Sequence, residues 1–466
     1  MKKIIALVAV LAALSSASVS GKIKSSVPAR VKNGTICLKT PAREKGQTSA
    51  LQLRCEPISK VRVGFIGLGM RGPGAVKRFS YINDAQIVAL CDLKQENVSK
   101  CQKILSSRNC PEAREYVGDD AWKRLCESDD IDLVYICTDW VNHTPMAVYA
   151  MNQGKHVAVE VPAAMSIAEC WDLVNTCEKT RRHCMMLENC VYDFFEMSVL
   201  NMAQNGVFGE VYYGEGGYIH NLTTYWDKYY NNWRLAYNNA HRGDNYPTHG
   251  IGPLCQVFGI HRGDRMTRLV SMDTSPRVGA ACAKKIMGSD SYAEGDHTTT
   301  LIRTHKGKVI EIQHNVYADR PYSRLYALTG TEGYAVKYPE QNISVKGEKL
   351  ERKAPDDLDV EKFAPKSFLK EVLADYEPEF AREIKDLAKK VGGHGGMDFI
   401  MDYRLVYCLK NGLPLDEDVY DAAEWSCLTE LSRLSIENGN IPVEVPDFTR
   451  GEWNVIDGFS YAMAVK

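Results

Sequence analysis

Short apolar runs and amphipathic stretches alternate regularly through residues 61–189. The apolar runs occupy residues 61–66, 86–92, 131–137, 156–161 and 184–188. The stretches between them have helical character, most clearly at residues 95–105, 119–127, 144–153 and 166–179. Strands and helices in repeated alternation are typical of parallel strands joined by crossover helices. The pattern therefore predicts an α/β fold, with a doubly wound parallel sheet in this part of the chain.

The pattern changes after about residue 189. A helical stretch at 194–205 precedes β-runs at 211–219, 298–303, 308–314, 324–329 and 334–337. Short turns at 306–307 and 330–333 join consecutive runs, which predicts an antiparallel meander. Residues 342–376 are charged and Pro-rich and predict an excursion or a linker, and helices are expected near 377–391, 398–411 and 416–438. Residues 190–466 are thus predicted to form a C-terminal α+β substrate domain with a large, mostly antiparallel sheet.

The N-terminus has the three-part layout of a secretory signal. Two lysines, an apolar run at residues 4–14 and small residues up to 21 predict a Sec-type signal peptide over residues 1–20. The apolar run is too short to span a membrane. We therefore expect an exported, periplasmic or secreted protein, with an N-terminal extension at residues 21–60.

Composition narrows the classes of partner. The 466 residues suffice for two domains, and the formal net charge of -2 gives no reason to expect nucleic acid or an anionic membrane surface as a partner. Many of the fifteen cysteines fall on apolar faces of expected elements, where free cysteine packs as a small hydrophobe. Because no CxxC pair and no Cys/His cluster with zinc spacing occurs, we predict no metal.

A glycine motif joins the first apolar run to a helix. Gly67, Gly69 and Gly72 form GxGxxG, in which the turn is too sharp for a Cβ and the backbone must approach a pyrophosphate at the helix N-terminus. Asp92 ends the second strand at the spacing expected for an acid that holds a ribose 2′-hydroxyl. Since Asp92 would repel a 2′-phosphate, the motif predicts a Rossmann domain over residues 61–189 that binds NAD rather than NADP.

Polar and aromatic residues follow three later strands. The carboxyl ends of parallel strands face the ligand, so Trp140 is expected to stack on the cofactor and His143 to donate to a ribose or phosphate. Glu160 ends the next strand, and residues 188–190 end the one after, with Tyr192 close behind. Each residue alone has capping or packing as an equally good explanation, but the set favours a functional site.

A second group of residues is suited to proton transfer. Tyr246 and His249 are three residues apart and would project from one face if the stretch begins a helix. A phenol beside an imidazole can move protons at a sugar ring. Residues 320–324, which include Tyr322, add an aromatic ring and two cations, although a solvated turn explains them equally well.

The motifs carry a family resemblance. Residues 61–331 resemble the glucose-fructose oxidoreductase and inositol dehydrogenase superfamily through GLGMRG, the acid after ALC, WVNH and HVAVEVPAA. Two positions depart from that group: Val161 stands where a lysine is typical, and Asn245 stands where an aspartate precedes His249. The segments EVPAA, LENCVYD, NWRLAYNNAHRGDNYPTHGIGP and RPYSR instead resemble glycoside hydrolase family 109, the NAD-dependent N-acetylgalactosaminidases.

That resemblance implies a redox-neutral glycosidase that releases terminal, α-linked N-acetylgalactosamine. The 3-hydroxyl is oxidised, the ketone acidifies the C2 proton, the glycosidic oxygen is eliminated, water adds, and the hydride returns. Such chemistry lies outside the usual two-carboxylate scheme. The implied partner is a glycan or glycoside substrate.

The resemblance also assigns residues to roles. The implied NAD contacts are Gly67, Gly69, Met70, Arg71, Gly72, Asp92, Trp140, Asn142, His143, Glu160, Val161, Asn189 and Tyr246. The implied sugar contacts are Tyr218, Arg234, Tyr246, Pro247, Thr248, His249 and Tyr322. Tyr246 and His249 are the first candidates for catalytic proton transfer, and Glu160 and Tyr192 are the second.

Two other functions agree with the same motifs. An exported NAD-dependent sugar dehydrogenase or oxidoreductase is allowed by the same fold and would produce NADH or use a paired acceptor sugar. A non-catalytic glycan- or NAD-binding protein would tolerate loss of His249. A homo-oligomer formed through the C-terminal sheet is a further expectation.

Overall fold

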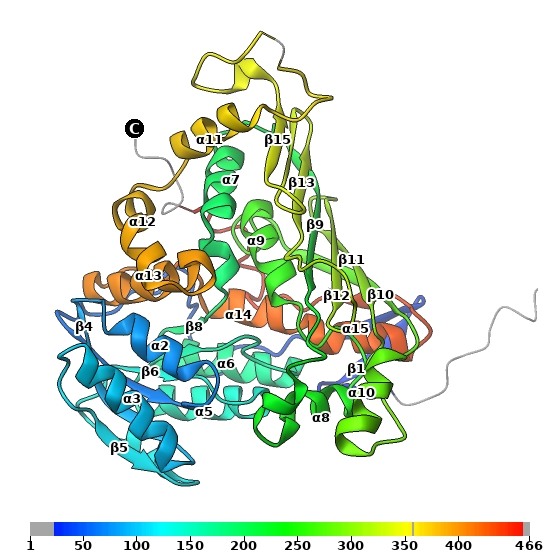
Figure 1. Cartoon of the computed structure of the whole chain (residues 1–466). Helices are drawn as coiled ribbons and strands as arrows, with labels where there is room; N and C mark the ends of the chain where they lie inside the picture. The colour runs from blue at the N-terminus through cyan, green and yellow to red at the C-terminus, as the bar shows by residue number, and fades with distance from the viewer. Residues whose placement is uncertain (1–22, 357, 460–466) are drawn as a thin grey trace, which may run out of the picture.

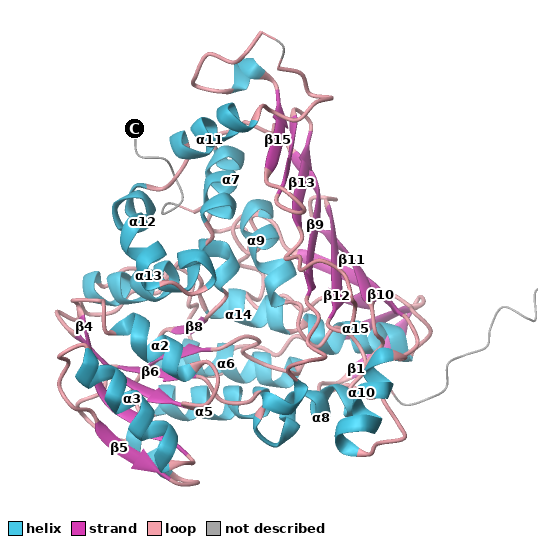
Figure 2. Ribbon diagram, viewed as in Figure 1, coloured by secondary structure: helices cyan, strands magenta, loops and turns pink. Residues whose placement is uncertain are grey.

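The computed structural model describes residues 23–356 and 358–459, so the predicted signal peptide lies outside the described residues. Two sheets dominate the chain (Figures 1 and 2). A six-stranded sheet lies in the part coloured blue to cyan in Figure 1, and a ten-stranded sheet stands at an angle to it at the right of the view. Helices fill the space between the two sheets (Figure 2).

The smaller sheet is entirely parallel, which confirms the predicted doubly wound sheet. Its order is β5-β4-β3-β6-β7-β8. The strands are β3 (Val61–Ile66), β4 (Ala85–Asp92), β5 (Arg114–Val117), β6 (Leu133–Ile136), β7 (His156–Val159) and β8 (Cys184–Met186). The chain crosses from one side of β3 to the other between β5 and β6, and dinucleotides bind at such a crossing.

Five helices connect these strands. They are α2 (Gly72–Phe79), α3 (Gln95–Ser107), α4 (Ala121–Cys126), α5 (Trp140–Asn152) and α6 (Ile167–Thr180). Helix α5 begins four residues before the predicted start, because Asp139 is the extended residue that caps it and Pro145 lies inside the helix. Trp140, Asn142 and His143 therefore belong to the first turn of α5, at the end of the helix that faces the glycine motif.

The larger sheet is mostly antiparallel, as predicted, in the order β1-β2-β16-β10-β11-β12-β9-β13-β14-β15. Its strands are β1 (Ala29–Lys32), β2 (Thr35–Leu38), β9 (Val211–Ile219), β10 (Met266–Asp273), β11 (Thr298–Thr304), β12 (Val309–Asn315), β13 (Tyr326–Gly330), β14 (Gly333–Val336), β15 (Asn342–Val345) and β16 (Val443–Glu444). The predicted meander is wrong at one point. Strand β9 lies between β12 and β13 and pairs in parallel with β12.

Both ends of this sheet contain strands that the pattern did not predict. The N-terminal extension contributes the hairpin β1–β2, and Ile36 of β2 pairs with Val443 of β16 near the other end of the chain. Strand β15 lies in the stretch predicted as a linker. All three are four-residue strands, too short for a reliable alternation signal.

The second half of the chain supplies the remaining helices. They are η1 (Asn189–Tyr192), α7 (Phe194–Gln204), η2 (Trp226–Lys228), η3 (Tyr230–Asn232), α8 (Trp233–Ala240), α9 (Thr248–Phe258), α10 (Val278–Met287), η4 (Gly347–Lys349), α11 (Lys366–Asp375), α12 (Glu379–Val391), η5 (His394–Gly396), α13 (Met397–Asn411), α14 (Val419–Ser426) and α15 (Leu428–Glu437). The single helix predicted at 416–438 is two helices that meet at Cys427. No helix in the described ranges is long and apolar enough to cross a bilayer.

Helix α9 lies in backbone contact with the larger sheet. A Cβ added at Gly216 of β9 would stand 2.0 Å from the carbonyl oxygen of Gly250. Only glycine permits this approach, which brings the first turn of α9 onto β9 (Figure 1). His249 is thereby held beside Tyr218, with ring centroids 5.1 Å apart.

Helix α13 joins the two halves of the molecule. It packs against α2 and β3 of the parallel-sheet domain. Asp402 of α13 accepts a hydrogen bond from Nε of Arg78 at 2.6 Å and one from the hydroxyl of Tyr135 at 2.9 Å. Because all three side chains are buried, the interface between the two halves includes a charged network that is shielded from water.

Candidate active site

The glycine motif forms an open cradle at the end of β3. Gly67 has φ +87°, and a Cβ there would lie 2.7 Å from the carbonyl oxygen of Cys137. A Cβ at Gly72 would lie 2.2 Å from the carbonyl oxygen of Gly67, whereas a Cβ at Gly69 would meet no atom within 4 Å. Gly67 and Gly72 thus make the turn possible, and Gly69 leaves its outer side free. These features fit a pyrophosphate group at the start of α2.

Asp92 connects the cradle to the next strand. Its Oδ2 accepts a hydrogen bond from the backbone N–H of Leu68 at 2.7 Å, and its Oδ1 accepts one from the N–H of Lys94 at 2.9 Å. The carboxylate is therefore fixed beside the glycine turn at the end of β4. This is the place and the charge expected for an acid that holds the ribose hydroxyls of NAD.

Trp140 is enclosed by aromatic residues of the second domain. Its ring is 5.6 Å from the stacked ring of Tyr246 and 5.1 Å from the edge-on ring of Trp233. The guanidinium of Arg234 lies 4.9 Å from the Trp140 ring and 4.4 Å from the Tyr246 ring. Trp140 is only 3% exposed. The predicted stacking on the cofactor therefore involves only the part of the ring that these aromatic residues do not cover.

The neighbours of Trp140 in α5 are engaged with the backbone. His143 is buried, with Nδ1 2.7 Å from the carbonyl oxygen of Pro162 and Nε2 3.2 Å from that of Thr138. The side chain of Asn142 donates to the carboxylate of Asp139. His143 thus connects the loops that follow β6 and β7, and Asn142 supports the first turn of α5.

Arg71 pairs with two carboxylates, and one of these also binds Asn189. Nε of Arg71 lies 3.2 Å from Oε1 of Glu160, and its NH2 lies 3.5 Å from Oδ2 of Asp398 on α13. The side-chain amide of Asn189 donates to Oδ1 of Asp398. The predicted cofactor residues Arg71, Glu160 and Asn189 are thus brought together, and Asp398, which the sequence analysis did not identify, links them.

Asp398 is ionised although it is buried. Burial opposes its ionisation, but the hydrogen bond with His394 and the charges of Arg78 and Arg71 hold its pKa well below the usual range. Its side chain is 1% exposed. The carboxylate therefore acts as a fixed negative charge between the two halves of the chain.

Replacement of Asp398 by asparagine is expected to destabilise the protein by roughly 3–5 kcal/mol at neutral pH, because a buried ion pair loses one partner. The pKa is depressed in the folded state, so the stabilisation is present above the ordinary aspartate pKa and is lost as the pH falls below it. The difference in the free energy of unfolding between the variant and the wild type should therefore decrease at acidic pH. Urea unfolding at several pH values measures this difference.

Asp375 provides the control for that experiment. It pairs with Arg352 on the surface, where both side chains are about one-third exposed, and such pairs contribute about 0–1 kcal/mol. An Asp398→Asn variant no less stable than Asp375→Asn would show that the buried pair does not support the interface.

A loop of glycines carries His394 to the edge of this network. Residues 392–396 all have positive φ, from 46° at His394 to 114° at Gly396. Nδ1 of His394 lies 3.0 Å from Asp398, and its side chain is 37% exposed. The charge of His394 also contributes to the lowered pKa values of His220 and His249, so the imidazole is near both. The sequence GGHGG could have indicated this loop, because four glycines around one histidine are unusual.

The structure brings Tyr246 and His249 together. Their ring centroids are 4.9 Å apart, with the rings edge to face. Helix α9 begins at Thr248, so His249 lies in its first turn and Tyr246 precedes it, rather than both lying within a helix. The Thr248 hydroxyl is buried and has no hydrogen-bond partner among the described residues, which leaves it available to a ligand.

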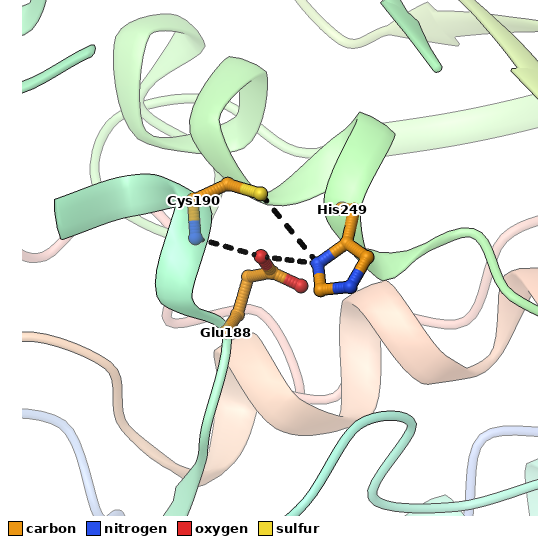
Figure 3. Close-up of side chains that lie close together, drawn as sticks. All are labelled: Glu188, Cys190 and His249. Atoms are coloured by element: carbon orange, nitrogen blue, oxygen red, sulfur yellow. Dashed lines mark hydrogen bonds and ion pairs between the residues drawn. The ribbon is translucent and has the colours of Figure 1, made fainter. Parts of the chain in front are cut away.

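Glu188 and Cys190 hold the inner side of the His249 ring (Figure 3). Oε1 of Glu188 lies 2.7 Å from Nδ1 of His249 and accepts the backbone N–H of Cys190 at 2.9 Å. Sγ of Cys190 lies 3.5 Å from the same Nδ1. Burial lowers the pKa of His249 to about 4, assisted by the charge of Arg324 and opposed by Glu188. His249 is therefore a neutral imidazole at neutral pH.

The two tyrosines beside His249 are neutral as well. Burial raises the pKa of Tyr246 well above its usual value, and it also raises the pKa of Tyr218. The hydroxyl of Tyr218 lies 2.7 Å from Nδ1 of His220. Neutral phenols and a neutral imidazole can both donate and accept protons, so the group is suited to general acid–base chemistry.

Arg324 lies beside Asn189 and Cys190. Its NH1 donates to Oδ1 of Asn189 at 2.9 Å and lies 3.0 Å from Sγ of Cys190, and its Nε donates to the hydroxyl of Tyr322. Tyr322 is 40% exposed and so lies at the rim. Arg324 belongs to the segment 320–324 that the sequence analysis singled out, and its role as a buried cation there was not predicted.

Tyr192 is placed differently from the other candidates. It is fully buried, and its hydroxyl donates to Oδ2 of Asp416 at 3.4 Å. Its surroundings favour a structural role over the catalytic role expected from the sequence.

One group of possible metal-ligand atoms was not predicted, because its residues are far apart in the sequence. Glu188, Cys190 and His249 offer ligand atoms within 4.8 Å of one another, although their spacing matches no metal motif. The guanidinium of Arg324 beside Sγ places a positive charge there already, which disfavours a second cation. The fifteen cysteines are all unpaired in the structure.

Comparison with known proteins adds two family matches. Residues 61–188 match the model "Oxidoreductase family, NAD-binding Rossmann fold", and residues 192–455 match "Glycosyl hydrolase 109, C-terminal domain". Solved structures with a similar fold include an NAD-binding oxidoreductase from Klebsiella pneumoniae, with a TM-score of 0.63 and 16% identity over 84% of this chain and 100% of that one. A levoglucosan dehydrogenase in complex with NADH has a TM-score of 0.61 and 15% identity, covering 83% and 100%. These likenesses show the fold.

Relatives of known family are far more similar in sequence. Glycosyl hydrolase family 109 protein 1 of Bacteroides thetaiotaomicron is 57% identical over 441 residues, which cover 93% of this chain and 94% of that protein. A glycosyl hydrolase family 109 protein of Porphyromonas gingivalis is 56% identical over 435 residues, covering 92% and 93%. The chain therefore belongs to glycosyl hydrolase family 109 and is a glycoside hydrolase with an NAD-binding Rossmann domain.

Proposed function

We propose that this glycosidase releases terminal, α-linked N-acetylgalactosamine by a redox-neutral, NAD-dependent mechanism. The observation that carries the proposal is the contact between the neutral phenol of Tyr246 and the neutral imidazole of His249, 4.9 Å apart by ring centroid, beside the residues that end the Rossmann strands. A pair of this kind serves proton transfer at a hydroxyl and at an adjacent carbon. It does not serve direct displacement by two carboxylates.

The residues of the cradle fit NAD. Gly69 leaves space for the pyrophosphate, Asp92 faces the ribose position, and Arg71, Glu160 and Asn189 converge at the other end. NAD bound there would supply reversible oxidation at C3 of the sugar. The role of the chain's own residues is to bind the sugar and to transfer its protons.

We assign the hydroxyl proton to Tyr246 and the carbon-bound proton to His249. Tyr246 lies against Trp140 and Arg234, on the Rossmann side of the pocket, and is placed to exchange a proton with the C3 oxygen. His249 is the stronger base of the two, because an imidazole accepts a proton far more readily than a neutral phenol does. Once C3 is a ketone, the C2 proton is acidic enough for an imidazole to remove.

The remaining polar groups are suited to hold the sugar. Tyr218 and the hydroxyl of Thr248, which has no hydrogen-bond partner among the described residues, lie next to His249, and the buried cations Arg234 and Arg324 both act on Tyr218. Tyr322 at the rim offers an aromatic face. Hydroxyl and acetamido groups of a sugar find donors at each of these positions.

The proposal is tested with a p-nitrophenyl N-acetyl-α-galactosaminide. We expect release of nitrophenol without added NAD, no accumulation of NADH, and one deuterium at C2 of the released sugar when the reaction runs in D₂O. Direct displacement never touches the C2 hydrogen, so a product without deuterium would overturn the mechanism. Steady NADH formation from free sugars, without glycoside cleavage, would identify a dehydrogenase instead.

We also propose export, on the sequence of residues 1–20 alone. A mature protein from the native host should begin near residues 18–22, and an N-terminal sequence starting at Met1 would contradict this expectation.

A further inference from the structure

We propose that Glu188 is a positioning residue that fixes the imidazole of His249 with the proton on Nδ1 and the lone pair of Nε2 directed at the sugar. The inference rests on the proposed function, in which His249 removes a proton. It concerns how the chain makes that histidine a base.

The carboxylate of Glu188 has little freedom. The residue is 0% exposed and precedes η1, where its Oε1 accepts the backbone N–H of Cys190 at 2.9 Å. The same Oε1 lies 2.7 Å from Nδ1 of His249, whose own position is set by the first turn of α9 on β9. Two rigid elements therefore meet through one short hydrogen bond (Figure 3).

The chemistry of the two groups determines where the proton lies. An ionised carboxylate only accepts hydrogen bonds, so Nδ1 must donate, and a neutral imidazole has a single N–H. Nε2 is then unprotonated, and it has no hydrogen-bond partner among the described residues. Figure 3 shows it turned away from Glu188. Without the carboxylate, either nitrogen could hold the proton, and only one of the two tautomers is a base toward the sugar.

Other groups around His249 do not supply the same constraint. The titratable and charged residues that face it are Glu188, Cys190, Tyr218, Tyr246, Arg324 and His394. Burial raises the pKa of the Cys190 thiol well above its usual value, so Cys190 is a neutral, weak partner at 3.5 Å. Arg324 has only donor groups, and Nδ1 of His394 is engaged with Asp398 at 3.0 Å, so neither replaces the carboxylate of Glu188 as the acceptor for Nδ1 of His249.

A second buried glutamate provides a matched control. Glu417 is 0% exposed, and its Oε2 accepts the backbone N–H of Glu188 at 3.3 Å. Burial and the neighbouring charge of Glu188 raise its pKa well above the usual value, so Glu417 is an uncharged acid. It lies next to Glu188 but does not bond His249, and glutamine is a close replacement for a neutral carboxylic acid.

The test compares Glu188→Gln with Glu417→Gln in the full-length enzyme. We expect Glu188→Gln to lower kcat by about 10²-fold with KM nearly unchanged, since loss of a carboxylate that orients a histidine costs about this much or more. The acid limb of the kcat/KM profile should move to lower pH, because Glu188 raises the pKa of His249. Glu417→Gln should keep kcat within about twofold and leave the limb in place.

The controls separate this inference from the proposed function. Bound NAD and thermal unfolding are measured for both variants, and Glu188→Asp, which keeps the charge with a shorter reach, should recover part of the lost kcat. If His249→Ala abolishes activity while Glu188→Gln behaves like Glu417→Gln, the positioning role is wrong and the proposed function stands. If His249→Ala retains activity, the assignment of the base fails first. If Glu188→Gln does not fold, equal kcat and an unmoved acid limb in Glu188→Asp would overturn the inference, whereas a partial loss would support it.

Discussion

Replacement of His249 by alanine is expected to lower kcat by about 10²–10⁴-fold, the usual contribution of a general base. The imidazole is neutral because burial lowers its pKa to about 4, and it contacts both Tyr246 and Glu188. KM should change much less than kcat, because the substitution removes a group that transfers a proton in the transition state and does not remove a contact that binds the sugar in the ground state. Steady-state kinetics with the nitrophenyl glycoside measure both parameters.

His305 is the control for this substitution. It lies at an exposed turn, 4.8 Å from the ring of Trp453, and has no part in the pocket. His305→Ala should leave kcat unchanged. Comparable activity of the two alanine variants would remove His249 from the chemistry.

Two glycines of the cradle are expected to respond in different ways to the same added methyl group. Gly72→Ala places a Cβ 2.2 Å from a backbone oxygen, so the turn must shift, and overpacking of this kind costs typically 1–3 kcal/mol and sometimes more. We expect a lower unfolding temperature together with loss of bound NAD. Gly69→Ala meets no protein atom within 4 Å and should leave stability unchanged while it weakens NAD binding.

This pair isolates the cofactor from the fold. NAD content after desalting and thermal unfolding are measured on the same preparations of each variant. A Gly69→Ala protein that retains its full NAD would show that the open side of the turn is not where the pyrophosphate lies. Activity that persists in NAD-free protein would contradict the proposed mechanism as a whole.

The parts of the fold predicted from sequence are those with a local pattern. Strand β3, the glycine turn and β4 can each be predicted from a few consecutive residues, because apolar periodicity and the steric limits on glycine turns are local in sequence. The hairpin β1–β2 was missed since its strands have only four residues each, β1 is largely exposed, and their partner β16 lies more than 400 residues further along the chain. Strand β9 inserts between β12 and β13, a long-range pairing that no local turn signal encodes.

The candidate site shows the same division. Tyr246, His249, Glu160 and Asn189 were found because each follows a strand or stands in an unusual segment. Their contacts were not predicted, since Glu188 and His249 are 61 residues apart and Asn189 and Asp398 are 209 residues apart. A helix was expected at 398–411, but sequence periodicity alone does not show which surface of another domain its first turn contacts.

The pairing of residues 35–38 with Val443 in one sheet sets the order in which parts of this protein can fold. Ser26 bonds Glu430, 404 residues further along, and Arg43 bonds Glu452 in the same manner. The N-terminal hairpin at the edge of this sheet is therefore synthesised long before the strand that it pairs with. The parallel-sheet domain contains its own strands and can assemble without residues 443–444, whereas the outermost hairpin lacks its partner in the sheet until Val443 has been added.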